Sequence, residues 1–256
     1  MMKYKICWIT LCKNEMDILP FVRQYWERLQ CNVLVMDNGS TDGSIEYLQS
    51  LPYVTLKHFD SEGHNDVIQK QVKEQAFQEL KDQYDFIILS DMDEVFYFEN
   101  AEKEIDKMLQ GNYNAMLLPL YSLCEDSKPL FQEDKLLHQL CHKFYKQRMN
   151  HMKGLEAYSK ISIFNTKNTD IVRMSVGQHY VQTLPTMNVM IGENAFGLHI
   201  DKGFGESYYA NKRKKMGENL SQTNINGGMG IEYLKREEES IKEYREHQAN
   251  SFDINT

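Results

Sequence analysis

The sequence lacks the signatures of several large protein classes. No apolar run reaches the length of a membrane-spanning helix, and neither an internal repeat nor a low-complexity tract is present. Basic residues are not in excess, since 29 Lys and Arg face 37 Asp and Glu and the net charge is −8. No general basic field is therefore available to recruit nucleic acid, and we expect neither a transmembrane segment nor a nucleic-acid partner.

Cysteines are few, odd in number and without the CxxC spacing of many metal and redox sites. The five cysteines lie at positions 7, 12, 31, 124 and 141. This pattern fits a reduced, cytoplasmic setting. The apolar part of residues 1–9 is too short for a signal peptide, so we expect it to form a first strand.

What is present is the composition of an ordinary globular domain, with 41% apolar and 26% charged residues. A chain of 256 residues can form one α/β domain with a good core, with or without an appendage. In the first half, strands are expected at 5–11, 33–36, 53–59 and 86–89, and helices after Asp17, up to Leu48 and at 66–80. This alternation predicts a mostly parallel central sheet with right-handed crossovers.

Two details of these helices can be tested. Asp17 is expected to cap the first helix, which carries Pro20 in its first turn. The helix at 66–80 is expected to bury a stripe that consists of Ile68, Val72, Ala76 and Leu80.

The second half is less regular. Helices are expected at 101–110, 206–220 and 231–248, a strand at 195–200, and a loop at 226–230. The run at 114–121 is expected to be a strand in which Pro119 indicates a sheet edge or a bulge. Residues 160–164 and 171–176 suggest a hairpin.

An acidic cluster follows the fourth expected strand. Asp91 and Asp93 are one residue apart, so their side chains share a face of extended chain, and Glu94 comes next. Ligands of open α/β sheets bind at the carboxyl ends of such strands. Two carboxylates there suit Mg²⁺ or Mn²⁺, whose remaining ligands are commonly substrate phosphates. The alternative is a strand end with solvated acids.

Three motifs in this order give the sequence a family resemblance. They are LCKNE at 11–15, VMDNGSTDGS at 35–44 and DMDE at 91–94. Together they resemble a family 2-type glycosyltransferase with the GT-A fold. The resemblance covers about the first 100 residues and continues more weakly at 160–164, 176–179 and 198–199. It implies a GT-A domain at 1–205, with a nucleotide-sugar-binding half at 1–100 and an acceptor-side half at 101–205, followed by a helical extension at 206–256.

The resemblance implies a nucleoside-diphosphate-sugar donor, a divalent metal (Mn²⁺ or Mg²⁺) and inversion at the sugar carbon. Asn14 and Glu15 would lie beside the nucleotide. Asp37 would accept hydrogen bonds from the base or ribose, and Asn38, Ser40 and Asp42 would shape its turn. Asp91 and Asp93 would contact the metal and the diphosphate. His199 would approach the metal or the diphosphate. The acceptor would be a hydroxyl of a glycan or glycolipid in surface polysaccharide biosynthesis, with contact to the inner face of a membrane left open.

The base that activates the acceptor hydroxyl is less defined. An acid beyond the metal motif is the usual solution, and Glu125 and Asp126 follow the next strand. Glu94 and Glu156 are rivals, and ordinary surface acids are the alternative to all four.

Two other signals have competing interpretations. His138 and His142 are spaced for one helix face and could belong to a zinc site, but a solvated helix face is the preferred interpretation. The basic run at 211–215 cannot all face one ligand, because consecutive helical residues point around most of a turn. One or two of its side chains could contact a donor diphosphate or an anionic acceptor, and solvation is the default.

Other functions remain as alternatives. Residues 91–95 also fit the DxDx[TV] motif of haloacid-dehalogenase-like phosphohydrolases, although those enzymes usually carry it on their first strand. A sugar nucleotidyltransferase would need a glycine-rich basic loop near the N-terminus, and residues 11–17 contain no glycine. A non-catalytic nucleotide-sugar-binding module is the third alternative.

Overall fold

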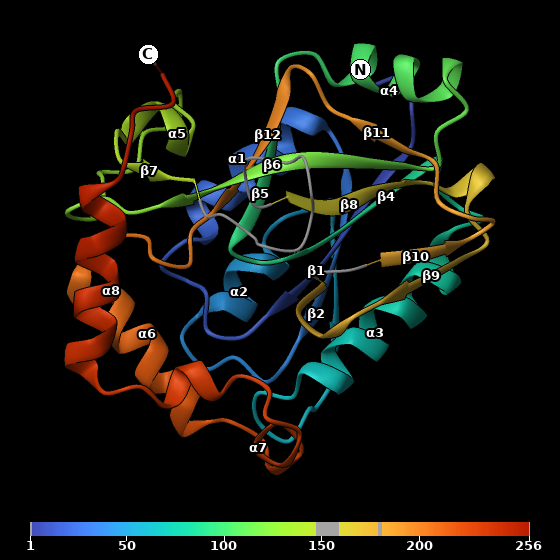
Figure 1. Ribbon diagram of the computed structural model, residues 1–256. Coiled ribbons are helices and arrows are strands. Elements are labelled where there is room, and N and C mark those ends of the chain that lie inside the picture. Colours follow the sequence, from blue (N-terminus) through green and yellow to red (C-terminus); the bar gives the residue numbers. More distant parts are fainter. Residues whose placement is uncertain (1, 147–158, 179–180, 256) are drawn as a thin grey trace.

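The computed structural model describes residues 2–146, 159–178 and 181–255 (Figure 1). A mixed sheet with the strand order β3-β2-β1-β4-β8-β6-β12-β5 runs through the molecule. Its first four strands are mutually parallel: β1 (Ile6–Cys12), β2 (Asn32–Asp37), β3 (Val54–His58) and β4 (Phe86–Asp91). The expected α/β fold with a mostly parallel centre is confirmed, and this arrangement is consistent with a GT-A-like nucleotide-binding domain.

Three helices connect these strands: α1 (Leu19–Leu29), α2 (Ser44–Gln49) and α3 (Asp66–Leu80). Trp8 and Ile9 are neighbours in β1 and belong to different core clusters, because successive strand residues point to opposite faces of the sheet. The cluster of Trp8 includes α1, and that of Ile9 includes α3. The expectation that Asp17 caps α1 is wrong, because Ile18 occupies that position and contributes no side-chain hydrogen bond.

The second half continues the sheet with β5 (Glu94–Phe98), β6 (Ala115–Leu123), β7 (Phe144–Tyr145), β8 (Ser159–Asn165), β11 (Val189–Ile191) and β12 (Ala195–His199). The helices α4 (Ala101–Gln110) and α5 (Leu137–Leu140) lie between strands. Strand β6 is internal, so an edge position for Pro119 is wrong. A bulge is present, but the register with β8 shifts between Met116 and Leu117 rather than at Pro119. On the other side of β6, Pro119 falls between the β11 and β12 ladders, so its missing N–H costs no ladder bond there.

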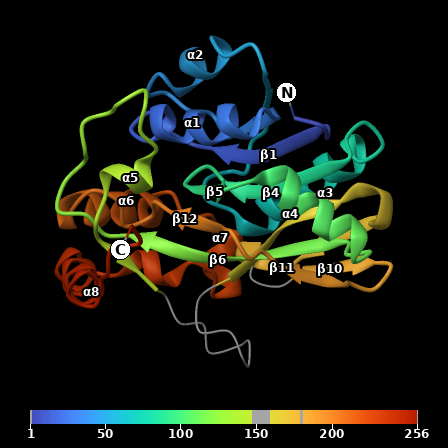
Figure 2. The same ribbon diagram turned by 90° about the horizontal axis from the view of Figure 1, so that it is seen from above.

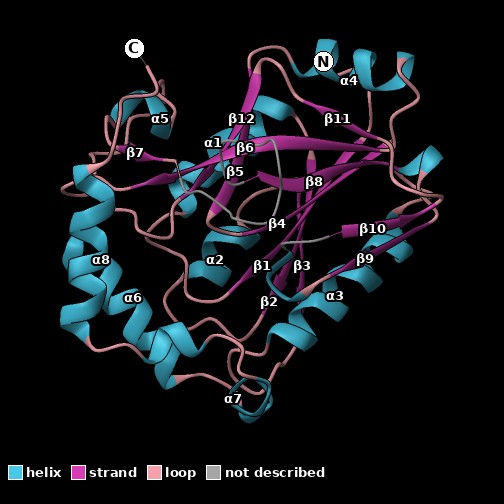
Figure 3. Cartoon of the chain, in the orientation of Figure 1, coloured by secondary structure: helices cyan, strands magenta, loops and turns pink. Residues whose placement is uncertain are grey.

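The expected hairpin of 160–164 with 171–176 is wrong. Strand β8 pairs with β4 and β6, while β9 (Ile171–Met174) pairs with β10 (Val181–Leu184) beside α3 (Figure 3). Residues 160–165 are all buried, as is typical of a strand in the interior of a sheet rather than in an exposed hairpin. His179, at the end of a weaker motif, and Glu156, a rival base, lie outside the described residues.

The chain ends in α6 (Glu206–Glu218), α7 (Gln222–Gly227) and α8 (Glu237–Ala249). Helices α6 and α8 pack side by side in both views (Figures 1 and 2). Part of the expected loop at 226–230 is helical, since α7 continues to Gly227. Among the described residues, no helix combines the length and apolarity needed to cross a membrane.

Candidate functional site

The carboxyl ends of three parallel strands begin the site. Cys12 at the end of β1 is in register with Asp37 at the end of β2, and Leu11 is in register with Asp91 at the end of β4. The loops that follow these strands therefore start side by side. Strand β12 pairs antiparallel with β5, which sets His199 opposite Glu94. This pairing brings the late histidine motif to the acidic cluster.

Side-chain hydrogen bonds join the loops after β1 and β2. Oδ1 of Asn14 accepts from the backbone N–H of Thr41 at 2.7 Å, and Ser40 Oγ accepts from the N–H of Asn14 at 2.8 Å. The Asp42 carboxylate accepts from the N–H of Met16 at 3.0 Å. Asn14 itself has a φ of +57°, a left-handed conformation that asparagine tolerates better than most residues. The two motifs thus form one polar surface.

Asp37 and Asn38 hold the second loop in shape. Asp37 is 2% exposed, and its carboxylate accepts from the N–H groups of Gly39 at 2.8 Å and Ser40 at 3.1 Å. The Asn38 amide donates to Ser61 Oγ at 2.7 Å and accepts from the Ser61 N–H at 3.1 Å. Both side chains therefore have a structural role, and a contact of Asp37 with a base or ribose stays a prediction.

Asp91 lies between two buried lysines. Lys73 Nζ from α3 is 2.6 Å from its Oδ1, and Lys160 Nζ from β8 is 3.6 Å from its Oδ2. Burial by itself would raise the pKa of Asp91, but the charges of Lys73 and Lys160 hold it well below its usual range. Lys160 also pairs with the fully buried Glu94 at 2.5 Å. Asp91 is therefore ionised and fixed at the end of β4.

Asp93 has different partners. Lys212 Nζ from α6 is 2.7 Å from its Oδ2, and His199 Nε2 is 3.7 Å from the same oxygen. Burial would raise the pKa of Asp93, whereas the charges of Lys212 and His199 hold it well below its usual range. Lys212 Nζ also lies 3.9 Å from Glu15 Oε1. One ammonium group thus joins the first motif to the third.

The pKa of Glu15 depends on several acidic groups that lie near it. Burial raises its pKa to about 7, while Lys212 lowers it, and the negative charges of Asp93, Asp42 and Asp91 add to the increase. Acids from the second and third motifs therefore influence the pKa of a side chain in the first.

Asp201 belongs to the same network and was missed by the sequence reasoning. Its Oδ1 is 3.7 Å from His199 Nδ1, and its Oδ2 is 2.8 Å from Lys202 Nζ. Burial would raise the pKa of Asp201, but His199 and Lys202 lower it to about 2. Burial would lower the pKa of His199, and Asp201 and Asp93 reverse this effect. His199 is thus held between two carboxylates; its position two residues before an aspartate was the available signal.

The carboxylates of Asp91 and Asp93 suit a divalent metal that takes its other ligands from outside the protein. The carboxylate oxygens of Asp91 and Asp93 are hard ligands of the kind that Mg²⁺ and Mn²⁺ prefer. Across the described parts of the chain, no three His, Cys, Asp or Glu side chains are grouped so that they could hold a metal by themselves. A metal at the aspartates would need further ligands from water or a bound anion, and it would compete with the lysines that are paired with these aspartates.

The expected catalytic bases have other partners. Glu125 Oε1 accepts from the N–H of Lys143 at 2.6 Å and from the N–H of His142. The exposed Asp126 pairs with Lys143 Nζ at 2.6 Å and accepts from Gln248 at 2.8 Å. Both acids follow β6, whose carboxyl end lies at the same edge as that of β4, but their carboxylates tie the 142–143 segment and α8 to this edge.

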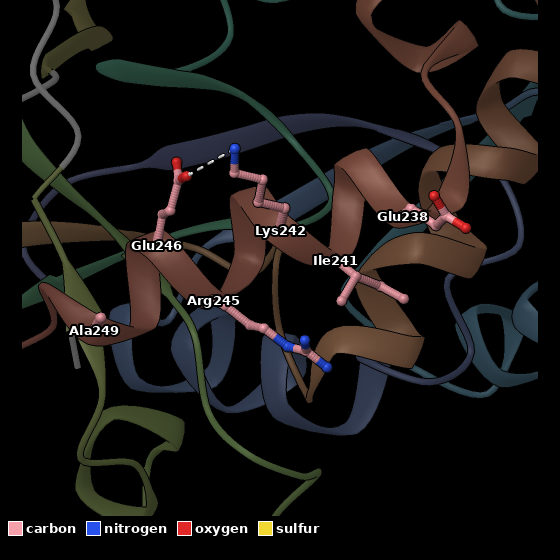
Figure 4. A pocket seen from close by; sticks show the side chains of 6 residues that line it. All are labelled: Glu238, Ile241, Lys242, Arg245, Glu246 and Ala249. Carbon is pink, nitrogen blue, oxygen red and sulfur yellow. Dashed lines mark ion pairs between the residues drawn. The ribbon is translucent and has the colours of Figure 1, made fainter.

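A surface hollow lies apart from this chemistry. It is lined by Glu238, Ile241, Lys242, Arg245, Glu246 and Ala249 (Figure 4). These six side chains all belong to α8, and Lys242 pairs with Glu246 at 3.9 Å. The hollow is one helix face and contains none of the motif residues.

Comparisons with known proteins add little detail. No family model and no curated protein matches the chain. A crystal structure of S. aureus TarS aligns with a TM-score of 0.47 and 11% identity over 86% of this chain and 44% of that chain. A structure of S. aureus TarS 1-349 aligns with a TM-score of 0.45 and 12% identity over 90% of this chain and 70% of that chain. The chain spans less than half of the first structure, and neither alignment assigns an activity.

Proposed function

We propose that this protein is a metal-dependent glycosyltransferase that moves a sugar from a nucleoside-diphosphate-sugar to a hydroxyl of a glycan or glycolipid, with inversion. One observation carries the proposal. Loops from β1, β2 and β4 meet at the sheet edge, where Lys212 joins Glu15 to Asp93 and the acids that follow β2 and β4 raise the pKa of Glu15. Ligands of open α/β sheets bind at such an edge, and a donor has three parts to hold there: base, diphosphate and sugar.

The proposed roles follow from position. The leaving diphosphate develops negative charge, which a divalent metal at Asp91 and Asp93 would stabilise. Lys73 and Lys160 keep Asp91 ionised and in place. The loop that Asp37 and Asn38 hold rigid presents backbone groups to a nucleotide, and this rigidity lowers the entropic cost of binding.

Fewer observations support the assignment of the base that activates the acceptor. Glu125 and Asp126 remain our candidates for the base, with Asp126 the more accessible of the two. Glu94 is the weaker candidate because it is fully buried in a pair with Lys160. A base must reach the acceptor hydroxyl on the face of the sugar opposite the diphosphate. We place the reaction in the cytoplasm, in surface polysaccharide biosynthesis.

A thermal-shift screen tests the proposal. UDP, GDP, dTDP and CDP are each added with and without Mn²⁺, because a ligand that binds only the native state raises the melting temperature. We expect one diphosphate to stabilise the protein, and to do so only with Mn²⁺. Stabilisation by none of them, together with Mg²⁺-dependent phosphatase activity, would replace the proposal with the phosphohydrolase alternative. Nucleotide binding without any turnover would favour the binding module.

A further inference from the structure

Lys212 connects parts of the site that are far apart in the sequence. It lies on α6, yet its ammonium group is 2.7 Å from Asp93 and 3.9 Å from Glu15. The side chains of Lys212, Asp93 and Glu15 are 19%, 13% and 18% exposed. The contact is therefore largely shielded from bulk water, although none of the three side chains is fully buried.

The neighbours of Lys212 in the basic run behave differently. Arg213 packs against Tyr209 and pairs with Glu243 at 3.3 Å, which fastens α6 to α8. Lys214 and Lys215 are exposed. The helix thus directs Lys212 into the acidic cluster, Arg213 to another helix and the last two lysines to the surface.

We propose, on the basis of the proposed function, that Lys212 is a movable counter-charge. Without donor it neutralises Asp93. With metal and diphosphate bound, Asp93 would hold the metal and the Lys212 ammonium group would move to a phosphate oxygen.

The physical reason is competition for one carboxylate. A divalent cation and the Lys212 ammonium group would both bind the carboxylate of Asp93. Because both are positively charged, they would repel each other at that distance. A bound diphosphate removes the conflict because it offers the ammonium group a new anionic partner. A lysine suits such a move, since its point charge sits on a flexible four-carbon stem with no fixed hydrogen-bonding plane.

The proposal has a thermodynamic consequence. Metal alone must displace Lys212 from Asp93 and therefore binds weakly. Metal that arrives with a diphosphate releases Lys212 to a favourable contact and binds more tightly. Lys212 thus couples the two ligands, and removing it must reduce that coupling.

Calorimetric titrations of the full chain test this, with Mn²⁺ alone and with preformed Mn²⁺–pyrophosphate as the two probes. We expect Lys212→Met to bind Mn²⁺ alone about five- to tenfold more tightly and Mn²⁺–pyrophosphate about five- to tenfold more weakly, the range for partly buried charge contacts. Lys214→Met, on the same helix and exposed, is the matched control and should match the wild type in both titrations.

The opposite changes in the two affinities distinguish this role of Lys212 from a purely structural one. If Lys212 only anchors α6, its loss moves both affinities in the same direction or neither, and that outcome overturns the proposal. Should Lys212→Met fail to fold, Lys212→Arg keeps the charge and must bind Mn²⁺ alone no more tightly than the wild type; tighter binding overturns the proposal equally.

The outcome is independent of the nucleotide screen. If Lys212→Met shifts the two affinities in opposite directions but no nucleoside diphosphate binds in the screen, the counter-charge role stands and the glycosyltransferase proposal is rejected. A nucleotide that binds with Mn²⁺, together with unchanged affinities in Lys212→Met, would keep the enzyme and reject the counter-charge.

Discussion

At the scale of single residues, Asp91 and Asp93 differ more than their shared motif suggests. Asp91 is paired with two buried lysines, from α3 and β8, whereas Asp93 meets Lys212 from α6 and His199 from β12. We expect Asp93→Asn to lose donor turnover by about 10²-fold or more, comparable to removing a group that stabilises transition-state charge. Release of nucleoside diphosphate from the donor measures this. The exposed Asp82→Asn is the control, and turnover near wild type in Asp93→Asn would remove Asp93 from the site.

Asp37 combines a structural and a proposed binding role. In Asp37→Ala the N–H groups of Gly39 and Ser40 lose their buried acceptor, which should lower the free energy of unfolding by about 1–3 kcal/mol. Nucleotide affinity should fall as well, because the loop loses its shape. Urea denaturation and a nucleotide titration measure the two effects. A loss of stability with unchanged nucleotide affinity would limit Asp37 to the structural role.

His138 illustrates how burial can change the interpretation of a motif. It is 6% exposed and its Nδ1 lies 3.1 Å from Tyr25 Oη, while His142 is exposed and pairs with Asp253. The two histidines therefore do not form a zinc pair. The expected solvated helix face is also wrong, because α5 ends at Leu140 and the exposed His142 lies outside it. Burial, followed by repulsion from Arg28, lowers the pKa of His138 from 6.5 to about 4.

This pKa predicts an acid-sensitive stability. The folded state binds the His138 proton less readily than the unfolded chain, so the contribution is complete above pH 6.5 and is lost as the pH falls towards 4. The loss should approach about 3 kcal/mol, at roughly 1.4 kcal/mol per pH unit. Urea denaturation between pH 7 and pH 4 measures the slope. His138→Gln should flatten it, and an equal slope in the variant would contradict the assignment.

At the scale of elements, local patterns were predictable and long-range partners were not. Helix α3 has the expected bounds, and β1, β2 and β4 lie where they were expected, although they end one or two residues later, at Cys12, Asp37 and Asp91. The expected stripe of α3 is largely wrong: apart from Ala76, the buried residues are Lys73, Glu74 and Phe77. The charged residues are buried because they meet partners from distant segments, and hydropathy cannot report such partners. Lys160 was missed for the same reason, and the basic run at 211–215 did not single out Lys212 as the residue that reaches Asp93.

Glu74 offers a test of these partners. Its carboxylate accepts from the N–H of Met174 at 2.6 Å and pairs with Arg173 at 3.4 Å, which joins α3 to β9. Glu74→Ala leaves that buried N–H without its acceptor, so we expect a loss of about 1–3 kcal/mol and faster hydrogen exchange at 171–174. The neighbouring exposed Gln75→Ala is the control. Unchanged exchange at β9 would mean that apolar packing alone holds this junction.

At the scale of the whole molecule, the C-terminal segment crosses the edge that carries the site. It leaves β12 at His199, reaches Asp93 through Lys212 and forms a β-bridge between Leu220 and His64. Helix α8 then returns, where Tyr244 donates to the carbonyl of Glu125. The boundary at 205 stays a prediction, but the residues beyond it contact both the donor-side loops and the expected acceptor side. We therefore expect stability and donor binding to depend on this segment together.

Asn224 is where this dependence can be tested most directly. It is fully buried in α7, donates to Asp66 Oδ2 at 2.7 Å and accepts from the Asp66 N–H at 3.1 Å, so it fastens the segment to α3. Asn224→Ala removes both bonds and should cost about 2 kcal/mol or more, with faster hydrogen exchange at 219–228. Because α6 precedes this anchor, Lys212 should also be less well placed and donor affinity should fall. The exposed Gln222→Ala is the control. Reduced stability with unchanged donor affinity would show that α6 holds Lys212 in place without α7.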